Sequence, residues 1–403
     1  MLGERIKKIR KQKKMTLEAL AGKELTKGML SLIENNKANP SMESLTYIAE
    51  RLQVEVSDLL EVVSSEELRG VLETAEKLYN TPIEKGTDKH QQLIALIEPF
   101  AENLSQGYEA ARLLEIYSYS LSHEKIQGWQ EISERAAKMF DQMNISANRS
   151  SIAIFRAFNK FIVHDYSQSL EIFLDERKVI EANHAYIDPL TRLDLDYHEA
   201  VLYYAVGDSE SATQIMESAL DFSKEKKIFY RIDELYRLAA AHAMMSRNEE
   251  KKACYLEKLK LYGEFADNLS SLHFYKLINI MYLISEKHEY SKALNELDEL
   301  LSHPETMEFY SPWYTLEKGK ALYYLGRYDE ALLHLNKVVL PDVHHPFDLS
   351  IFYVLDTFKA LCYFELGNKK EAIVSIQTAA NNFKPLPDTP FKAFSLRTYE
   401  KIV

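Results

Sequence analysis

A pattern that recurs about every forty residues over most of the chain constrains its fold more than any other feature. In the clearest copies, residues 318–331 and 359–372, an aromatic-rich helical stretch ends at a Gly turn and an Ala follows in a second helical stretch; residues 199–208 match the first part. The small residues of the second stretches lie 43, 41, 40, 38 and 41 positions apart; they are Ser169, Ala212, Ala253, Ala293, Ala331 and Ala372. A nearly constant period of this size indicates a helical solenoid, whose repeats bury their faces only by stacking on one another.

The composition favours helices throughout. The chain has 403 residues, of which 46% are hydrophobic, and only 12 are Gly and 11 are Pro. Because Gly and Pro are the residues that break helices, their scarcity predicts an all-α protein. The length exceeds one compact core, so we expect two or three domains, or one small domain followed by an extended array.

The charge of the chain is unevenly distributed. The net charge is −12, yet residues 1–37 hold ten Lys and Arg against four Glu, and residues 38–60 hold one Arg against four acidic residues. The first sixty residues therefore total +3 and the remainder −15. A basic head on an acidic body is typical of a nucleic-acid-binding module joined to a domain that avoids nucleic acid.

Five short helices are predicted in these sixty residues. They span residues 3–13, 16–21, 26–35, 41–52 and 57–60. Three of them have a suitable capping residue at the start, namely Thr16, Thr26 and Ser41. In the third helix the spacing predicts that Met29, Leu30 and Ile33 face the core.

Over residues 3–61 the sequence resembles the XRE/Cro family of helix-turn-helix domains. The resemblance is carried by residues 6–10, 15–21, 30–35 and 39–52. It implies that the third helix lies in the major groove of DNA. The side chains that it implies at base edges and nearby phosphates are Thr26, Lys27, Ser31, Asn35, Asn36 and Lys37. Those that it implies as contacts to the DNA backbone are Arg10, Lys11, Lys13 and Lys14.

The chain departs from this family pattern at three places. Leu17 stands where many relatives carry a Gln that helps to hold a phosphate, Gly28 offers no side chain for readout, and the turn over residues 22–25 is one residue short. A helix-turn-helix domain that serves protein contacts and has lost DNA binding therefore stays open as an alternative.

The repeat pattern resembles the tetratricopeptide repeat, lengthened from its usual period of about 34 residues. This resemblance implies a right-handed solenoid that binds a peptide or protein on the concave surface lined by the first helices. The residues expected on that surface are Phe158, Tyr197, His198, Tyr204, His242, Tyr275, Asn279, Tyr282, Trp313, Lys320 and Tyr323. Asn279 offers both a donor and an acceptor to a peptide backbone, and Lys320, Arg156 or Arg237 is expected to receive a peptide carboxylate.

Catalysis, metal binding and membrane insertion are not expected. The sequence contains no nucleotide-binding, zinc-protease or hydrolase motif. Cys254 and Cys362 lack the spacing of a disulfide framework or metal site, and His344 and His345 fall in a predicted loop. The amino terminus lacks the apolar stretch of a signal peptide, and no run of about 18 apolar residues occurs. We therefore expect a cytoplasmic protein that is not an enzyme and has no cofactor.

A Cro-type domain followed by a tetratricopeptide-like array resembles the domain organisation of the RRNPP regulators of Gram-positive bacteria, named for Rgg, Rap, NprR, PlcR and PrgX. Residues 25–36 and the length of the array are most like NprR. The resemblance implies a quorum-sensing transcription regulator in which a short signalling peptide in the repeat groove changes dimer or tetramer geometry. Its expected domains are a DNA-binding domain (1–62), a linker helix (63–80) and a peptide-binding and oligomerisation domain (81–403). The alternative is a Rap-like module that binds a response regulator of the sporulation phosphorelay.

Overall fold

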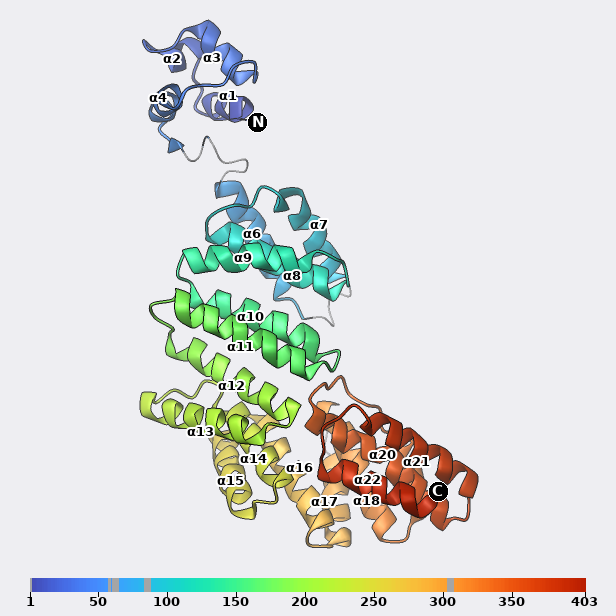
Figure 1. The fold of residues 1–403 in the computed structure, drawn as a ribbon. Coiled ribbons are helices and arrows are strands. Elements are labelled where there is room, and N and C mark those ends of the chain that lie inside the picture. Colours follow the sequence, from blue (N-terminus) through green and yellow to red (C-terminus); the bar gives the residue numbers. More distant parts are fainter. Residues whose placement is uncertain (1, 57–58, 60–64, 83–87, 303–307) are drawn as a thin grey trace. The chain divides into compact units, whose positions relative to one another are not determined.

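The structure is a computed structural model that describes residues 2–56, 59, 65–82, 88–302 and 308–403 (Figure 1). Every element assigned among these residues is a helix, which confirms the predicted all-α class. The chain divides into two units, residues 1–152 and 153–403, which are described separately. Within the described residues, no helix combines the length and the apolar character that crossing a membrane requires.

The first helices form the predicted helix-turn-helix domain. They are α1 (Leu2–Gln12), α2 (Leu17–Ala21), α3 (Lys27–Glu34) and α4 (Met42–Leu52). The three predicted caps are confirmed, because the side chains of Thr16, Thr26 and Ser41 each accept a hydrogen bond from the backbone N–H three residues later. The core between these helices is apolar and fully enclosed; it includes Ile6, Leu20, Leu30, Ile33, Leu45, Ile48 and Leu52. The predicted fifth helix lies largely outside the described residues.

One core assignment in α3 is wrong. Met29 is 44% exposed and Leu32 is 45% exposed, whereas Leu30 and Ile33 are buried. Residues three positions apart share a helix face, so Met29 and Leu32 form an apolar pair on the outer face of α3. The short apolar run of α3 did not reveal which of its residues face inward.

Residues 63–80 were predicted to be a linker helix, and the structure corrects this. Helix α6 (Ser65–Tyr79) packs against α7 (Lys89–Ala101) and α8 (Tyr108–His123). Ala75 of α6 is fully buried in a core that α9 (Trp129–Gln142) also lines. Apolar residues at helical spacing on α6 supply this contact; they are Leu68, Val71, Leu72, Ala75 and Leu78. Helix α6 is therefore the first helix of the array.

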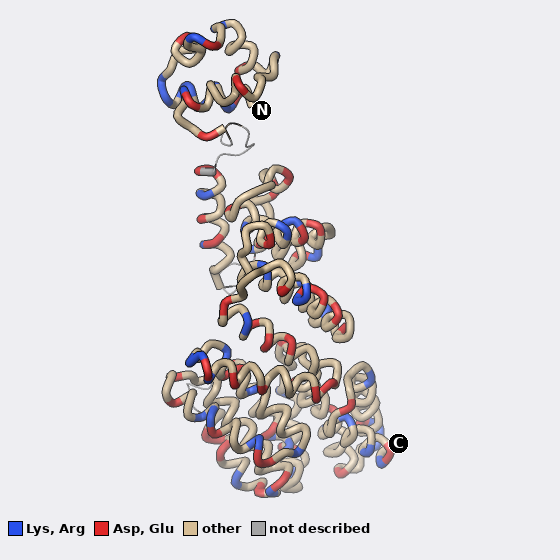
Figure 2. The backbone as a smooth tube through the Cα atoms, turned by 60° about the vertical axis from the view of Figure 1, so that its left-hand side comes forward, with Lys and Arg blue, Asp and Glu red and all other residues tan. Residues whose placement is uncertain are grey.

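The second unit consists of paired helices, whose described buried residues form one large cluster and two smaller ones. The first helices of the pairs are α10 (Ser146–Phe161, which begins in the first unit), α12 (Pro189–Val206), α14 (Ile232–Met245), α16 (Leu269–Ser285), α18 (Ser311–Tyr324) and α20 (Pro346–Glu365). The second helices are α11 (Tyr166–Asn183), α13 (Ser209–Lys226), α15 (Glu249–Phe265), α17 (Tyr290–Ser302), α19 (Tyr328–Leu335) and α21 (Lys369–Phe383). The short helix η2 (Glu308–Tyr310) precedes α18, and α22 (Pro390–Ile402) follows the last pair. Figure 2 shows both basic and acidic positions along these helices.

The turn within each pair sets the register of the small residues. A residue with positive φ stands in every turn; these are His164, Gly207, Arg247, His288, Gly326 and Gly367. The residue five positions later is buried in each pair: Ser169, Ala212, Lys252, Ala293, Ala331 and Ala372. Ser169 shows how close the helices come, since its hydroxyl donates to the carbonyl oxygen of Ala157 at 2.7 Å.

The prediction that Ala253 is one of these buried positions is therefore wrong. Ala253 is exposed, and its neighbour Lys252 is 5% exposed. The Lys252 ammonium lies 2.5 Å from a Glu249 carboxylate oxygen and 4.0 Å from the centre of the Tyr282 ring. The long side chain thus places its charge between a carboxylate and an aromatic face, which satisfies it at a position where the other repeats carry a small residue.

Candidate nucleic-acid interface and ligand pocket

The outer face of α3 brings together most of the residues predicted to contact bases. Thr26 and Lys27 begin the helix and are exposed, Ser31 is half-buried, and Asn35 and Lys37 are exposed at its end. The Lys27 ammonium lies 2.5 Å from a Glu18 carboxylate oxygen, and the two side chains are 59% and 66% exposed. Exposed ion pairs of this kind contribute little to stability, so Lys27 can exchange Glu18 for a nucleic-acid acceptor at small cost.

Asn35 and Asn36 at the end of α3 are held by internal hydrogen bonds. The Asn35 amide donates to the Ser31 carbonyl at 2.8 Å and accepts from the Lys7 ammonium at 3.2 Å. Asn36 has a φ of 56° and accepts from the backbone N–H of Gly3 at 2.9 Å. Both side chains therefore fix the end of α3 against α1.

Arg10 was predicted to contact the DNA backbone, and the structure contradicts this. Its guanidinium donates to both carboxylate oxygens of Glu34 at 2.6 and 2.8 Å and to the Met15 carbonyl at 2.8 Å. The hydrogen bond to Glu34 raises the pKa of Arg10. A bidentate pair with side chains 11% and 3% exposed leaves no guanidinium for a phosphate. Lys14 is exposed at the end of α1 and stays a candidate, as do Lys11 and Lys13.

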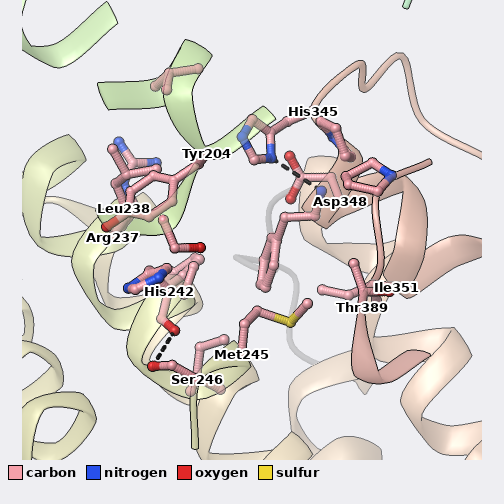
Figure 3. Close-up of a pocket in the computed structure, with 18 of the residues that line it drawn as sticks. Tyr204, Arg237, Leu238, His242, Met245, Ser246, His345, Asp348, Ile351 and Thr389 are labelled. Atoms are coloured by element: carbon pink, nitrogen blue, oxygen red, sulfur yellow. Dashed lines mark hydrogen bonds between the residues drawn. The ribbon is translucent and has the colours of Figure 1, made fainter. Parts of the chain in front are cut away.

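The second unit contains a cavity of about 590 Å³. The first helices α12, α14, α16, α18 and α20 line it, together with the turn before α22. Figure 3 shows side chains of α14, among them Arg237, Leu238 and His242, on one side and Asp348 and Ile351 of α20 on the other. The walls are mainly apolar and aromatic, with Phe161, Val201, Phe274, Leu277, Phe309, Tyr310, Trp313 and Phe347 among the lining residues.

The sequence predicted the lining helices better than the lining residues. Tyr197, Tyr204 and Arg237 line the cavity as predicted, and so do His242 and Trp313. The remaining predicted residues do not line it; they are Arg156, Phe158, His198, Tyr275, Asn279, Tyr282, Lys320 and Tyr323.

Several of these residues are engaged elsewhere. Arg156 pairs with Glu176, and Lys320 is buried with its ammonium 2.7 Å from Glu317. His198 donates to the Asp194 carbonyl at 2.7 Å. These partners account for polar side chains that the repeat pattern alone had assigned to a ligand.

The aromatic residues in this group have packing partners of their own. The ammonium of Lys252 lies over the Tyr282 ring, and the ammonium of Lys260 lies 5.8 Å from the centre of the Tyr275 ring. Tyr323 packs edge to face against Phe358. Asn279 lies on α16 but on a side of that helix which does not reach the cavity.

The cavity wall carries polar atoms whose hydrogen-bonding capacity is incomplete. Arg237 donates to Asp233 at 3.2 Å and to the Ser270 hydroxyl at 3.4 Å, yet its Nε has no hydrogen-bond partner among the described residues. The indole N–H of Trp313 is likewise buried without a partner within the described part of the chain. Buried N–H groups normally find an acceptor, so these two mark a place where a ligand is expected to supply one.

Asp348 and His345 hold the opposite wall, and sequence reasoning had assigned neither to the site. Burial raises the pKa of the Asp348 carboxyl to about 7, although the charge of Arg237 opposes the shift. Burial also lowers the pKa of His345 to about 4, so its ring is neutral at pH 7 and accepts from the backbone N–H of Phe347 at 3.1 Å. One feature of the sequence could have indicated Asp348. It lies at the start of the first helix of a repeat, and the first helices were expected to line the ligand-binding surface.

No group of three or more His, Cys, Asp or Glu side chains suited to a metal ion occurs among the described residues. Cys254 is exposed and Cys362 is buried, and neither forms a disulfide.

Comparison with known proteins assigns the first domain. Residues 3–65 match the family model described as a helix-turn-helix domain. The chain is 38% identical over 94 residues to the HTH-type transcriptional regulator SinR of Bacillus subtilis, a match that covers 85% of SinR and 23% of this chain. The chain belongs to the HTH-type transcriptional regulators. It is therefore a DNA-binding regulator and not an enzyme, and the alternative of a helix-turn-helix domain without DNA binding is not favoured.

Two further similarities extend beyond this domain. The immunity repressor protein of Bacillus phage phi105 is 29% identical over 144 residues, which cover 36% of this HTH-type regulator and 89% of the repressor. The crystal structure of Bacillus thuringiensis PlcR in complex with the peptide PapR7 and DNA is 17% identical, covering 66% of this chain and 95% of that one, with a TM-score of 0.34. A TM-score of this size does not establish a common overall fold, so the family assignment rests on the amino-terminal match.

Proposed function

We propose that this regulator is a cytoplasmic quorum-sensing transcription factor of the RRNPP type, which binds duplex DNA through α3 and is switched by a short peptide in the cavity of the second unit. The observation that carries this proposal is the cavity itself. Its volume of about 590 Å³ falls within the range of about 300–1,000 Å³ that is typical of ligand pockets, and its walls combine aromatic side chains with a few polar groups. The helices that line it are the first helices of successive pairs.

The size of the cavity limits how a peptide binds. A pocket suited to a drug-sized ligand holds the anchoring residues of a peptide, and the remaining residues lie outside it. Tyr197, Tyr204 and Arg237 are the predicted residues that we retain for this contact. Because a ligand that touches several helix pairs favours one arrangement of them, it can shift the dimer or tetramer geometry that sets half-site spacing.

The switch is tested with the full chain, DNA and synthetic peptides encoded by short reading frames beside its gene. We expect one such peptide to change both the footprint on DNA and the native mass. Leu238→Trp should fill the cavity from α14, abolish the response to the peptide and leave peptide-free DNA binding unchanged. Leu333→Trp on α19 is the control, since Leu333 is 57% exposed and does not line the cavity. A full response in the Leu238 variant would place the peptide elsewhere.

For DNA, we propose that Met29 and Leu32 act beside Lys27 and Ser31 on the outer face of α3. Met29 and Leu32 are apolar side chains that the fold leaves exposed in the helix expected to enter the major groove. The 5-methyl group of thymine is the apolar feature of the major groove, and aliphatic side chains contact it. The regulator is therefore expected to prefer thymine at one or two operator positions.

This preference has a direct test in operator duplexes in which single thymines are replaced by uracil, which lacks the methyl group. At the positions read by Met29 and Leu32, each replacement should weaken binding about fourfold, which corresponds to about 0.8 kcal/mol per buried methyl. Leu32→Ala should remove the effect at its position, whereas Met42→Ala, on α4 with an exposure of 63%, should not. Equal sensitivity to uracil in all variants would exclude the proposed contact. Lys27→Ala and Ser31→Ala should relax specificity by about 1–3 kcal/mol per lost base contact.

The Rap-like alternative gains no support from the structure or from the relatives described above, and we do not propose it. The particular likeness to NprR stays a prediction.

A further inference from the structure

Asp348 is the charged side chain of the cavity whose charge is least compensated. It is half-buried in the first turn of α20 and lines the cavity, and no hydrogen bond or ion pair joins it to any residue that the structure describes. The other acidic residues of the wall have partners: Glu234 lies 2.6 Å from Arg231, and Asp388 lies 3.3 Å from Lys392. Asp348 therefore differs from them in having no cation of its own.

The groups that face Asp348 do not supply this cation. Arg237 of α14 lies on the opposite side of the cavity (Figure 3) and is already held by Asp233 and Ser270. Tyr197 of α12 and Tyr310 of η2 lie near enough for the Asp348 charge to affect their pKa values, and burial raises both values further above the ordinary tyrosine pKa, so neither phenol carries a charge at pH 7. His345 is neutral at this pH as well.

We infer that the cavity selects peptides that carry a cationic group, which pairs with Asp348 while a neighbouring apolar side chain packs on the aromatic wall. This inference rests on the proposed function and names the chemical class of its ligand. An ionised carboxylate in a mainly apolar pocket is costly unless it is paired and hydrogen-bonded. An amine or guanidinium supplies both the opposite charge and the N–H donors, and charge-assisted hydrogen bonds are the strong ones.

The raised pKa of Asp348 agrees with this picture. In the empty cavity the carboxyl holds its proton up to about pH 7, because burial disfavours the anion. A bound cation stabilises the anion, so binding releases this proton below pH 7. Affinity should accordingly rise about tenfold per pH unit up to about pH 7 and then level off.

The cationic group can be the peptide's α-amine or a Lys or Arg side chain, and pH separates the two. An α-amine loses its proton near pH 7.7–8.0, whereas Lys and Arg keep theirs beyond pH 10. A peptide held by its α-amine should therefore bind less tightly again at pH 9, and one held by a side chain should not.

The experiment uses the full chain and a synthetic library of carboxy-amidated hexapeptides, half with free and half with acetylated α-amines. Peptides retained by the protein are separated by gel filtration at pH 5.5, 7.5 and 9.0 and identified by mass spectrometry. At pH 7.5 we expect the retained peptides to be enriched in cationic and apolar residues. Asp348→Asn should reduce the enrichment in cations about tenfold and leave the preference for apolar residues intact.

Asp388→Asn is the matched control, because Asp388 also lines the cavity but is exposed and paired with Lys392. Its cation enrichment should equal that of the wild type. Retention of peptides without enrichment in cations, or with the same enrichment in the Asp348 variant, would overturn the inference and leave the proposed function standing. Retention of no peptide at all would instead contradict the proposed function.

A second measurement shows that the Asp348 variant is folded. A carboxyl whose pKa is raised on folding makes the protein less stable as pH rises from about 4 to about 7. Asp348→Asn removes this dependence, so its unfolding temperature at pH 7.5 should be equal to or higher than that of the wild type.

Discussion

Glu34→Gln is expected to unfold the DNA-binding domain of the full chain and to leave the helical array folded. Among the residues that the structure describes, Glu34 is the acceptor for the Nε and Nη2 groups of Arg10, and both side chains are nearly inaccessible to water. Removing one charge of a buried pair leaves the other uncompensated, at a cost of about 3–5 kcal/mol. A domain of about sixty residues has a stability of only about 3–9 kcal/mol, so a cost of this size is a large fraction of its stability or exceeds it.

Hydrogen exchange of the full chain measures this domain by domain. The backbone N–H groups of α1 and α3 should lose protection in the Glu34 variant, while those of α12 and α14 should not. The control is Glu18→Gln, which removes the exposed partner of Lys27 and should change stability by about 0–1 kcal/mol. Comparable loss of protection in both variants would show that burial of the Arg10–Glu34 pair is not what stabilises the domain.

Arg177→Met is expected to destabilise the second unit by a similar amount. The Arg177 guanidinium on α11 lies 2.6 Å from carboxylate oxygens of both Asp196 and Glu199 on α12, which are buried. Without Arg177, two carboxylates face each other in a site that excludes water. We expect a loss of about 3–5 kcal/mol at pH 8.

The loss should be smaller at pH 5. Burial already raises the pKa of Glu199, and the charge of Arg177 opposes the shift. Without that charge the folded-state pKa rises further, so a proton bound at low pH relieves the repulsion and stability falls as pH rises. Thermal unfolding at pH 5 and pH 8 measures this difference.

Arg192 supplies the matched control, since it approaches the same Asp196 at 3.6 Å but is 49% exposed. Arg192→Met should change stability by less than about 1 kcal/mol at either pH. If the two substitutions had equal effects, the buried position of Arg177 would not be the cause.

Local features were predictable from the sequence because their causes lie within a few residues. Thr16, Thr26 and Ser41 cap helices through backbone groups three positions away, and the Gly turns at Gly207, Gly326 and Gly367 join the two helices of a pair. The helices that line the cavity followed from the repeat, because the first helix of each pair has the same place in the array.

Features that depend on the rotation of a helix or on a distant partner were not predictable. Arg10 and Glu34 are 24 residues apart, and nothing near either one indicates that they pair. Phe274 and Leu277 reach the cavity from α16 and Asn279 does not, a difference set by how α16 packs on its neighbours. Ala253 was predicted to be buried because it is the small residue of its helix. The buried position is instead set by the left-handed turn at Arg247, which places Lys252 there.

Lys252 is a buried lysine at the position where the other helix pairs of the second unit carry a small residue. Its ammonium is enclosed by Glu249 and the Tyr282 ring, whereas most lysines of the described chain lie at the surface. Amine-reactive reagents modify accessible lysines first, so we expect Lys252 to be modified slowly, when its contact with Tyr282 of α16 opens. The rate of labelling at this residue therefore reports how often the middle of the array opens, without any probe being introduced into the protein.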